Sequence, residues 1–85
     1  MVKNIYSIHD RLIGFLNIVL EENDEVACRN FRNSMKLKHS ALYANKEDLS
    51  LFKHGSYDTL TGEIVPCPTP VCIIRGIDIM LDKEE

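Results

Sequence analysis

The sequence predicts a small α+β domain, in which an antiparallel sheet of four or five strands packs one face against one helix, in the order ββαββ(β). Three observations support this fold class. Two β-rich runs open the chain, one segment has helical periodicity, and a polar turn with glycine joins two further β-rich runs. With 85 residues the chain has room for one domain, which we assign to residues 1–77, followed by an acidic tail at residues 78–85.

The N-terminal segment predicts two antiparallel strands. Residues 2–9 (VKNIYSIH) are rich in β-branched and aromatic types, and Asp10 and Gly14 then supply a turn. Residues 15–20 follow as a more buried strand, antiparallel because the connection is short. The apolar run LIGFLNIVL is too short to span a bilayer, and the acidic EENDE after it does not suit a signal-peptide cleavage site. We therefore expect no membrane association and no export.

Residues 24–38 give the clearest periodic signal, that of an amphipathic helix. Asn23 or Asp24 can cap its N-terminus, where negative charge also suits the helix dipole. The apolar stripe consists of Ala27, Cys28, Phe31 and Met35. The opposite side is polar and basic, and carries Arg29, Arg32, Asn33 and Lys36.

The C-terminal half predicts a hairpin. Residues 49–54 form a third strand, and the turn YDTLTGE uses Gly62 for a positive φ before Ile64 begins the return strand. We expect the three prolines of PCPTP to end that strand, because proline removes a hydrogen bond from the ladder. The run VCIIRG is then a last edge strand, and the acidic tail after it is expected to fray.

The segment FKHGSYDTLTGE is a hairpin and not a phosphate-binding or catalytic loop. Gly55 and Gly62 are seven residues apart, without the lysine and the helix that a Walker loop requires. Only His54 is near as a base, and there is no GxSxG elbow. The other histidines, His9 and His39, lie on different elements without ligand spacing. We expect no enzyme.

The three cysteines, Cys28, Cys67 and Cys72, fit reduced cytosolic thiols better than a disulfide framework, because their number is odd. Cys67 and Cys72 lack the second pair of ligands that a zinc site needs. We therefore expect no metal and no cofactor.

The formal net charge of −3 is unevenly distributed. Residues 26–46 contain five basic residues and no acid, whereas residues 78–85 carry a net charge of −3. The basic side of the helix has two interpretations: a solvated surface, or a surface for phosphate oxygens, which arginine contacts bidentately. The lack of acidic partners four residues away within this stretch favours phosphate. Tyrosine rings such as those of Tyr6, Tyr43 and Tyr57 could stack on unpaired bases, although strand tyrosines commonly serve as packing residues. The candidate DNA-binding residues are Arg29, Arg32, Asn33, Lys36, Lys38, Lys53 and Tyr57.

The order of three motifs, IYSIHDRLIGF, NDEVACRNFRNSM and LSLFKHGSYDTLTGEI, resembles the small nonstructural protein of gokushovirus-type microviruses, phages with circular single-stranded DNA genomes. The similarity covers residues 4–65. Phe52 stands where a tyrosine is common, and PCPTPVCII and the acidic tail match no part of the pattern. The resemblance implies a DNA-binding protein of viral replication, acting at the switch to single-strand synthesis and packaging in the bacterial cytoplasm.

Two functions follow as hypotheses. The first is nonenzymatic DNA binding through phosphate contacts, with single-stranded DNA favoured. The alternative is a protein–protein adaptor that docks on a viral or host replication protein. We also expect a homodimer or larger assembly, because one helix covers one sheet face only. The apolar residues expected to exceed that cover are Ile5, Ile8, Leu16, Ile18, Leu20, Val71, Ile73 and Ile74. Alternatively, the segment 71–81 folds back over the second face.

Overall fold

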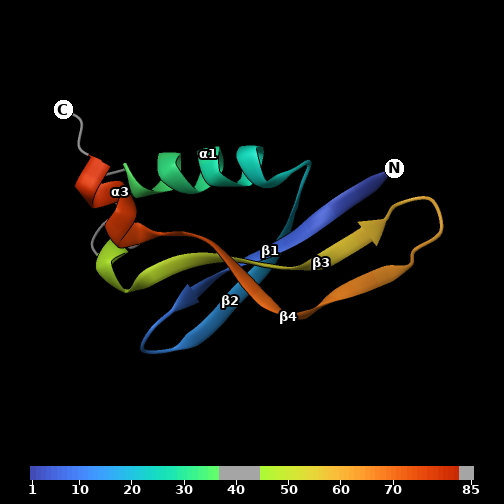
Figure 1. Cartoon of the computed structure of the whole chain (residues 1–85), viewed down its shortest axis with the longest axis horizontal. Coiled ribbons are helices and arrows are strands. Elements are labelled where there is room, and N and C mark those ends of the chain that lie inside the picture. Colours follow the sequence, from blue (N-terminus) through green and yellow to red (C-terminus); the bar gives the residue numbers. More distant parts are fainter. Residues whose placement is uncertain (37–44, 83–85) are drawn as a thin grey trace.

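The fold is a four-stranded antiparallel sheet with α1 across one face, seen in a computed structural model that describes residues 1–36 and 45–82 (Figure 1). The elements in chain order are β1 (Val2–Asp10), β2 (Gly14–Glu21), α1 (Asp24–Met35), the 3-10 helix η1 (Lys46–Asp48), β3 (Leu49–Asp58), β4 (Ile64–Arg75) and α3 (Gly76–Asp82). The strand order across the sheet is β2-β1-β3-β4. The expected α+β class and the ββαββ order are confirmed.

Helix α1 begins where the sequence predicts. The side chain of Asn23 accepts a hydrogen bond from the backbone N–H of Val26 at 2.8 Å, which caps the first turn. The helix ends at Met35, with Lys36 as its C-cap, so it is shorter than the predicted segment 24–38. Lys38 lies outside the described residues.

The hydrophobic core lies between α1 and the sheet. Its buried members are Tyr6, Ala27, Phe31, Met35, Leu49 and Leu51. Four isoleucines pack against them: Ile8, Ile73, Ile74 and Ile79. Three of these, Ile8, Ile73 and Ile74, were expected to exceed what one helix covers, and that expectation is wrong for them because they pack against the core. It is also wrong for Ile5, which is 8% exposed.

The C-terminal segment forms a helix where a fraying tail was expected. Ile79 of α3 packs against the core, which holds this short helix at the end of the sheet where α1 also ends (Figure 1). Asp78 accepts two hydrogen bonds from the guanidinium of Arg75, at 3.0 and 3.2 Å. The segment 71–81 therefore does not fold back across the second face of the sheet.

Strand β4 runs through the prolines that were expected to end it. β4 is an edge strand and pairs only with β3. The prolines lack a backbone N–H, but on the outer edge there is no further strand with which that N–H would have to pair. Between the pairs Gly55↔Pro66 and Lys53↔Val71, β4 advances five residues while β3 advances two. The extra residues form a bulge, and the prediction of two separate strands is wrong because the edge position tolerates both features.

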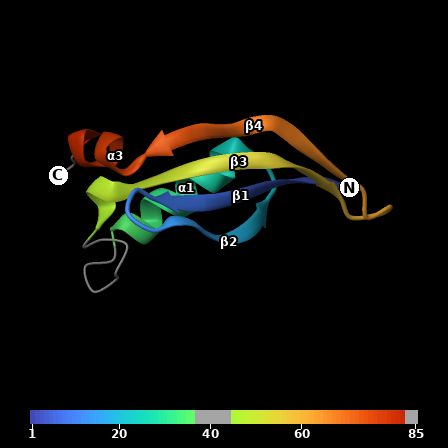
Figure 2. The ribbon, with the colours of Figure 1, turned by 90° about the horizontal axis from the view of Figure 1, so that it is seen from below.

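The strand registers define two faces of the sheet. Directly opposed residues of antiparallel strands share a face, and neighbours along a strand alternate. Of the rows that turn away from α1, three, together with His54, form what we call the open face. The rows are Leu20–Ile5–Gly55–Pro66, Ile18–Ser7–Phe52–Cys72 and Phe15–His9–Ser50–Arg75. Figure 2, a view from below, shows the sheet in front of α1.

Candidate nucleic-acid interface

Four of the predicted DNA-binding residues line one side of α1. Arg29, Arg32, Asn33 and Lys36 border a shallow hollow of about 410 Å³, together with Asp24, Glu25 and Cys28. The helical repeat gathers them, because residues three and four apart are neighbours on a helix surface. The rise of about 1.5 Å per residue places Arg29 and Lys36 about 10 Å apart along the axis.

Charge is graded along this hollow. The acidic side chains of Asp24 and Glu25 lie at its N-terminal end, while Arg29, Arg32 and Lys36 lie farther along the helix. The expectation that the basic residues have no acidic neighbour four positions away is wrong at one point, since Glu25 precedes Arg29 by four residues. The stretch 26–46 indeed has no acid, but the surface extends one turn beyond it.

The two outermost cations of the hollow have room for an anion. The side chains of Arg29 and Lys36 form no hydrogen bond or ion pair with residues in the described ranges 1–36 and 45–82, and both residues are exposed. Arg32 is half-buried and lies near Cys28, where its positive charge partly offsets the effect of burial. Burial nevertheless raises the pKa of the Cys28 thiol, so this cysteine is a weak nucleophile.

Lys53 lies at the acidic end of the hollow. Its ammonium is 3.8 Å from the carboxylate of Asp24, which also accepts a hydrogen bond from the hydroxyl of the fully buried Tyr6. Asn4 donates to the same hydroxyl at 3.1 Å. Burial and the neighbouring Asp24 raise the pKa of Tyr6 well above its usual value. This network ties the first turn of α1 to β1 and β3, and Lys53 is therefore already paired.

Tyr57 does not join the basic side of α1. It is half-buried and stands opposite Lys3 in the register of β1 and β3, on the side of the sheet that turns away from α1. The Lys3 ammonium is 2.7 Å from Glu22. The predicted set is thus divided: four residues share the hollow, Lys53 borders it, Tyr57 lies on the other side, and Lys38 falls outside the described residues.

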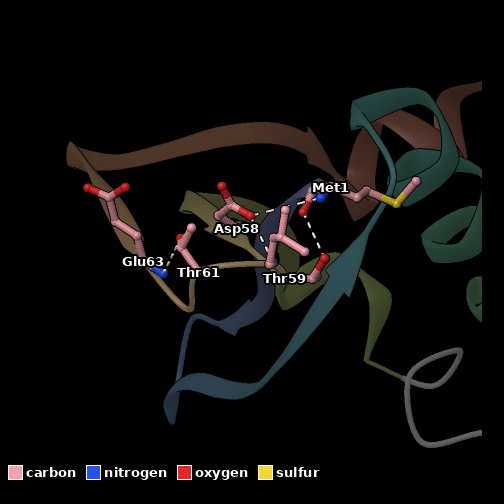
Figure 3. A network of polar contacts seen from close by, with 6 residues as sticks. Met1, Asp58, Thr59, Thr61 and Glu63 are labelled. Atoms are coloured by element: carbon pink, nitrogen blue, oxygen red, sulfur yellow. Dashed lines mark hydrogen bonds and ion pairs between the residues drawn. The ribbon is translucent and has the colours of Figure 1, made fainter.

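The turn between β3 and β4 is held by its own polar groups (Figure 3). The backbone N–H of Leu60 donates to the carboxylate of Asp58 at 2.8 Å, and the N-terminal ammonium of Met1 is 3.9 Å from the same side chain. Thr59 donates to the carbonyl of Met1 at 2.9 Å. The hydrogen bond from Leu60 is the main cause that lowers the pKa of Asp58. With Gly62 at a φ of 82°, the turn agrees with the hairpin predicted from the sequence.

The sequence analysis missed a cluster of rings on the open face. The ring centroid of Phe15 lies 4.6 Å from that of His9, 5.5 Å from that of Phe52 and 5.0 Å from that of His54. The bulge at Lys53–Gly55 turns His54 to this side. No local pattern indicates the cluster, because its members come from three strands and meet only through the β1–β2 and β1–β3 pairings together.

A serine and a histidine also meet on the open face. The hydroxyl of Ser7 lies 2.6 Å from Nε2 of His54, which resembles two members of a hydrolytic triad. Ser7 is 1% exposed, so its hydroxyl is closed off from a substrate. Among the described residues no acid hydrogen-bonds to His54 to orient the ring. The pair satisfies polar groups within the sheet and does not make a nucleophile.

A cleft between α1 and β2 is too small for a drug-sized ligand. Its volume is about 160 Å³, and Asn17, Val19 and Asn30 are among its lining residues. Pockets for such ligands usually measure about 300–1,000 Å³.

Within residues 1–36 and 45–82, no three His, Cys, Asp or Glu side chains gather as metal ligands would. In the same part of the chain, no helix has the length and apolar character needed to cross a membrane.

Comparison with known proteins identifies the family. The model of the Phage ORF5 protein family matches residues 3–79, which includes the sheet, α1 and most of α3. No curated protein and no solved structure matches the chain significantly. The family match covers most of the 85 residues. The chain therefore belongs to the Phage ORF5 protein family and is a bacteriophage protein.

Proposed function

We propose that this protein is a nonenzymatic, nonstructural DNA-binding protein of a gokushovirus-type microvirus. In this proposal it acts in the cytoplasm of the bacterial host, in single-stranded DNA replication or the control of genome packaging. The family match supports the phage origin, and the motif order described above supports the gokushovirus assignment. The observation that carries DNA binding is the row of cations along one side of α1.

The spacing of the cations suits a nucleic-acid strand. Arg29, Arg32 and Lys36 lie along about 10 Å of helix, and a stacked strand rises about 3.4 Å along its axis for each phosphate. One helix can therefore contact roughly three phosphates, and Asn33 adds a hydrogen-bonding group between them. Such contacts position a strand without reading its sequence, so we expect limited sequence preference.

Salt dependence of binding tests this proposal. Anisotropy titrations with a labelled single-stranded oligonucleotide should give a slope of log K against log salt of about −2 per chain, from three contacts at about −0.7 each. Arg29→Gln and Lys36→Gln should each weaken binding and reduce the slope by about 0.7. A duplex of the same sequence, measured in parallel, reports the expected preference for single strands.

Arg11→Gln is the matched control. Arg11 is an exposed arginine on the turn between β1 and β2, and its guanidinium is 2.9 Å from Asp48. Its replacement should leave both the affinity and the slope unchanged. If Arg29→Gln, Lys36→Gln and Arg11→Gln all bind like the wild type, the hollow along α1 is not the DNA-binding surface.

The adaptor hypothesis has one observation in its favour. The hollow has acids at one end and cations at the other, a pattern that also suits a protein segment of complementary charge. The two hypotheses predict different results in the anisotropy titration with the labelled oligonucleotide. An adaptor would show no DNA binding at physiological salt, although its fold is intact by circular dichroism.

A further inference from the structure

We propose that the open face of the sheet is the interface of a symmetric homodimer, in which a second copy of this chain covers the Phe15 ring cluster. This interface is separate from the hollow along α1. The proposal concerns the protein without DNA, so it stands or falls independently of the proposed function.

The exposed apolar side chains of the open face lie along β2, whereas Ile5 and Ser7 of β1 are already buried in the single chain. Ile18 is 65% exposed, Phe15 is 47% exposed and Leu20 is 42% exposed. They stand in three successive rows at the β2 edge of the sheet, so their exposed apolar groups are contiguous along β2 and not scattered. Contiguous apolar surface of this kind on a small soluble protein marks an interaction site.

Two polar groups at the centre of this face already have a partner, whereas the side chains of His9 and Ser50 form no hydrogen bond with the described residues. Ser7 and His54 hydrogen-bond to each other at the centre, at 2.6 Å. Among the described residues, no buried side-chain nitrogen or oxygen lacks a hydrogen-bond partner. A dry protein surface can therefore cover the centre without stranding a donor or acceptor.

The charges around the face favour a second copy over a nucleic acid. Arg75 at one corner is bound by Asp78, Lys3 near another is bound by Glu22, and Arg11 at the adjoining turn is bound by Asp48. Each cation is thus neutralised within its own chain. A nucleic-acid strand would have to displace these acids, whereas an identical chain meets a neutral surface and no like-charge repulsion.

The size of the face fits a dimer. Four strands about 4.8 Å apart, with the three rows spanning β1 from Ile5 to His9, give a projected face of roughly 20 Å by 17 Å. Side-chain relief makes the accessible area larger than this projection, toward the low end of stable interfaces at roughly 600 Å² per partner. A two-fold axis between the two sheets and parallel to them would bring the ring cluster of one chain against the open face of the other.

This arrangement places the two copies of α1 on opposite outer faces. Two sheets pack about 10 Å apart, and a helix lies about 10 Å from the sheet that it covers, so the helices are about 30 Å apart. The sequence-based expectation that doubling sets the two basic helices side by side does not hold for this interface. A dimer of this form would present its two basic hollows to different strands or different segments of one strand.

Sedimentation of the free protein gives the first test. The wild type should sediment as a dimer of the 9.7 kDa chain at micromolar concentration. Ile18→Glu, a charge in the central row, should weaken the dimer at least 100-fold and give a folded monomer. The control is Val19→Glu on the same strand: Val19 is 47% exposed and faces the α1 side, and its dimer should be unchanged.

Two single-cysteine variants give the second test, which does not depend on weakening the dimer. Cys72 stands in the central row of the open face, whereas Cys28 lies on α1. Spin labels on the variant that keeps only Cys72 should lie within about 20 Å of each other in the dimer. Labels on the variant that keeps only Cys28 should be about 30 Å apart or more.

Three outcomes would overturn the proposal. The wild type could remain monomeric at about 100 µM, which would mean that any self-association is too weak to form a dimer. Ile18→Glu could stay dimeric, which would assign the contact to an edge strand or to α1. The free protein could be monomeric while Ile18→Glu loses binding to single-stranded DNA, which would assign the open face to nucleobases.

Discussion

The two faces of the sheet are built from the same four strands, yet only one of them is closed. Under α1, Phe31 is 3% exposed and Tyr6 is fully buried. On the open face, Phe15 keeps 47% of its surface in solvent although it contacts three other rings. A strand with apolar residues on both sides needs a layer on each side, and a chain of this size supplies one. The comparison shows that ring contacts within a sheet do not replace a second layer.

The largest expected effect comes from truncating one phenylalanine on each face and comparing the loss of stability. Phe31→Ala should lower the free energy of unfolding by about 3–5 kcal/mol, because it leaves a cavity in the closed core. Phe15→Ala, measured at a concentration where the chain is monomeric, should cost about 1 kcal/mol because the ring is half-exposed. Urea denaturation followed by circular dichroism measures both. Equal losses would mean that the open face is as closed as the core.

The next effect concerns the bulge that turns His54 toward the open face. A Cβ atom on Gly55 would lie 2.3 Å from the carbonyl oxygen of Val65 and 2.8 Å from Cα of Pro66, so an alanine must push β3 and β4 apart. Gly14 also has a positive φ, but no atom lies within 4 Å of its Cβ position. Gly55→Ala should therefore destabilise the protein by about 1–3 kcal/mol more than Gly14→Ala. Equal melting temperatures would contradict the close approach of the two strands.

A smaller effect concerns the hydrogen bond that joins the closed face to α1. Tyr6→Phe removes the hydroxyl that donates to Asp24 and should cost about 1 kcal/mol at neutral pH. Because the pKa of Tyr6 is raised in the folded state, its contribution is complete below about pH 10 and is lost as pH rises beyond that value. The variant should lose less stability than the wild type in alkaline buffer. An equal alkaline loss of stability in the wild type and in Tyr6→Phe would contradict this assignment.

The smallest effect lies in the hairpin turn, away from both faces. The pKa of Asp58 is lowered in the folded state, so its contribution is present above about pH 4 and is lost as the pH falls through the folded value. Asp58→Asn should melt slightly below the wild type at pH 7, and the two curves should converge in acid. Calorimetric melts between about pH 2.5 and pH 7 follow this window. Melting curves that stay equally far apart in acid would contradict this role of Asp58.

The sequence predicted the elements that depend on local pattern. The spacing of Ala27, Phe31 and Met35 determined the buried side of α1, and Asn23 its start. The hairpin followed from Gly62 and its polar neighbours. These signals involve residues within one or two turns of each other, so no knowledge of the rest of the fold is needed.

What the sequence did not predict depends on pairing between distant strands. His9 and His54 were assigned to separate elements; the β1–β2 register places His9 opposite Phe15, and the β1–β3 register brings His54 to the same rings. The prolines were expected to end the strand as they would in a central strand. That β4 lies at the edge follows only from the strand order of the sheet, which the local sequence does not reveal. Within the candidate site, helical periodicity was enough to predict that Arg29, Arg32 and Lys36 lie on the same side of α1. The position of Tyr57 could not be predicted in this way, because it depends on the register of β3.

The strand order β2-β1-β3-β4 has a consequence for how the chain is made. The central ladder pairs Val2 with Asp58, so the inner edge of β1 stays unpaired during translation until about two thirds of the chain has been synthesised. Ladders between residues so far apart in sequence form slowly, and an open edge accepts any matching strand. Two nascent chains can then exchange their β1–β2 hairpins and fill each other's gap between β1 and β3. Hairpin exchange is therefore the characteristic folding error of this topology, and its frequency should rise with expression level.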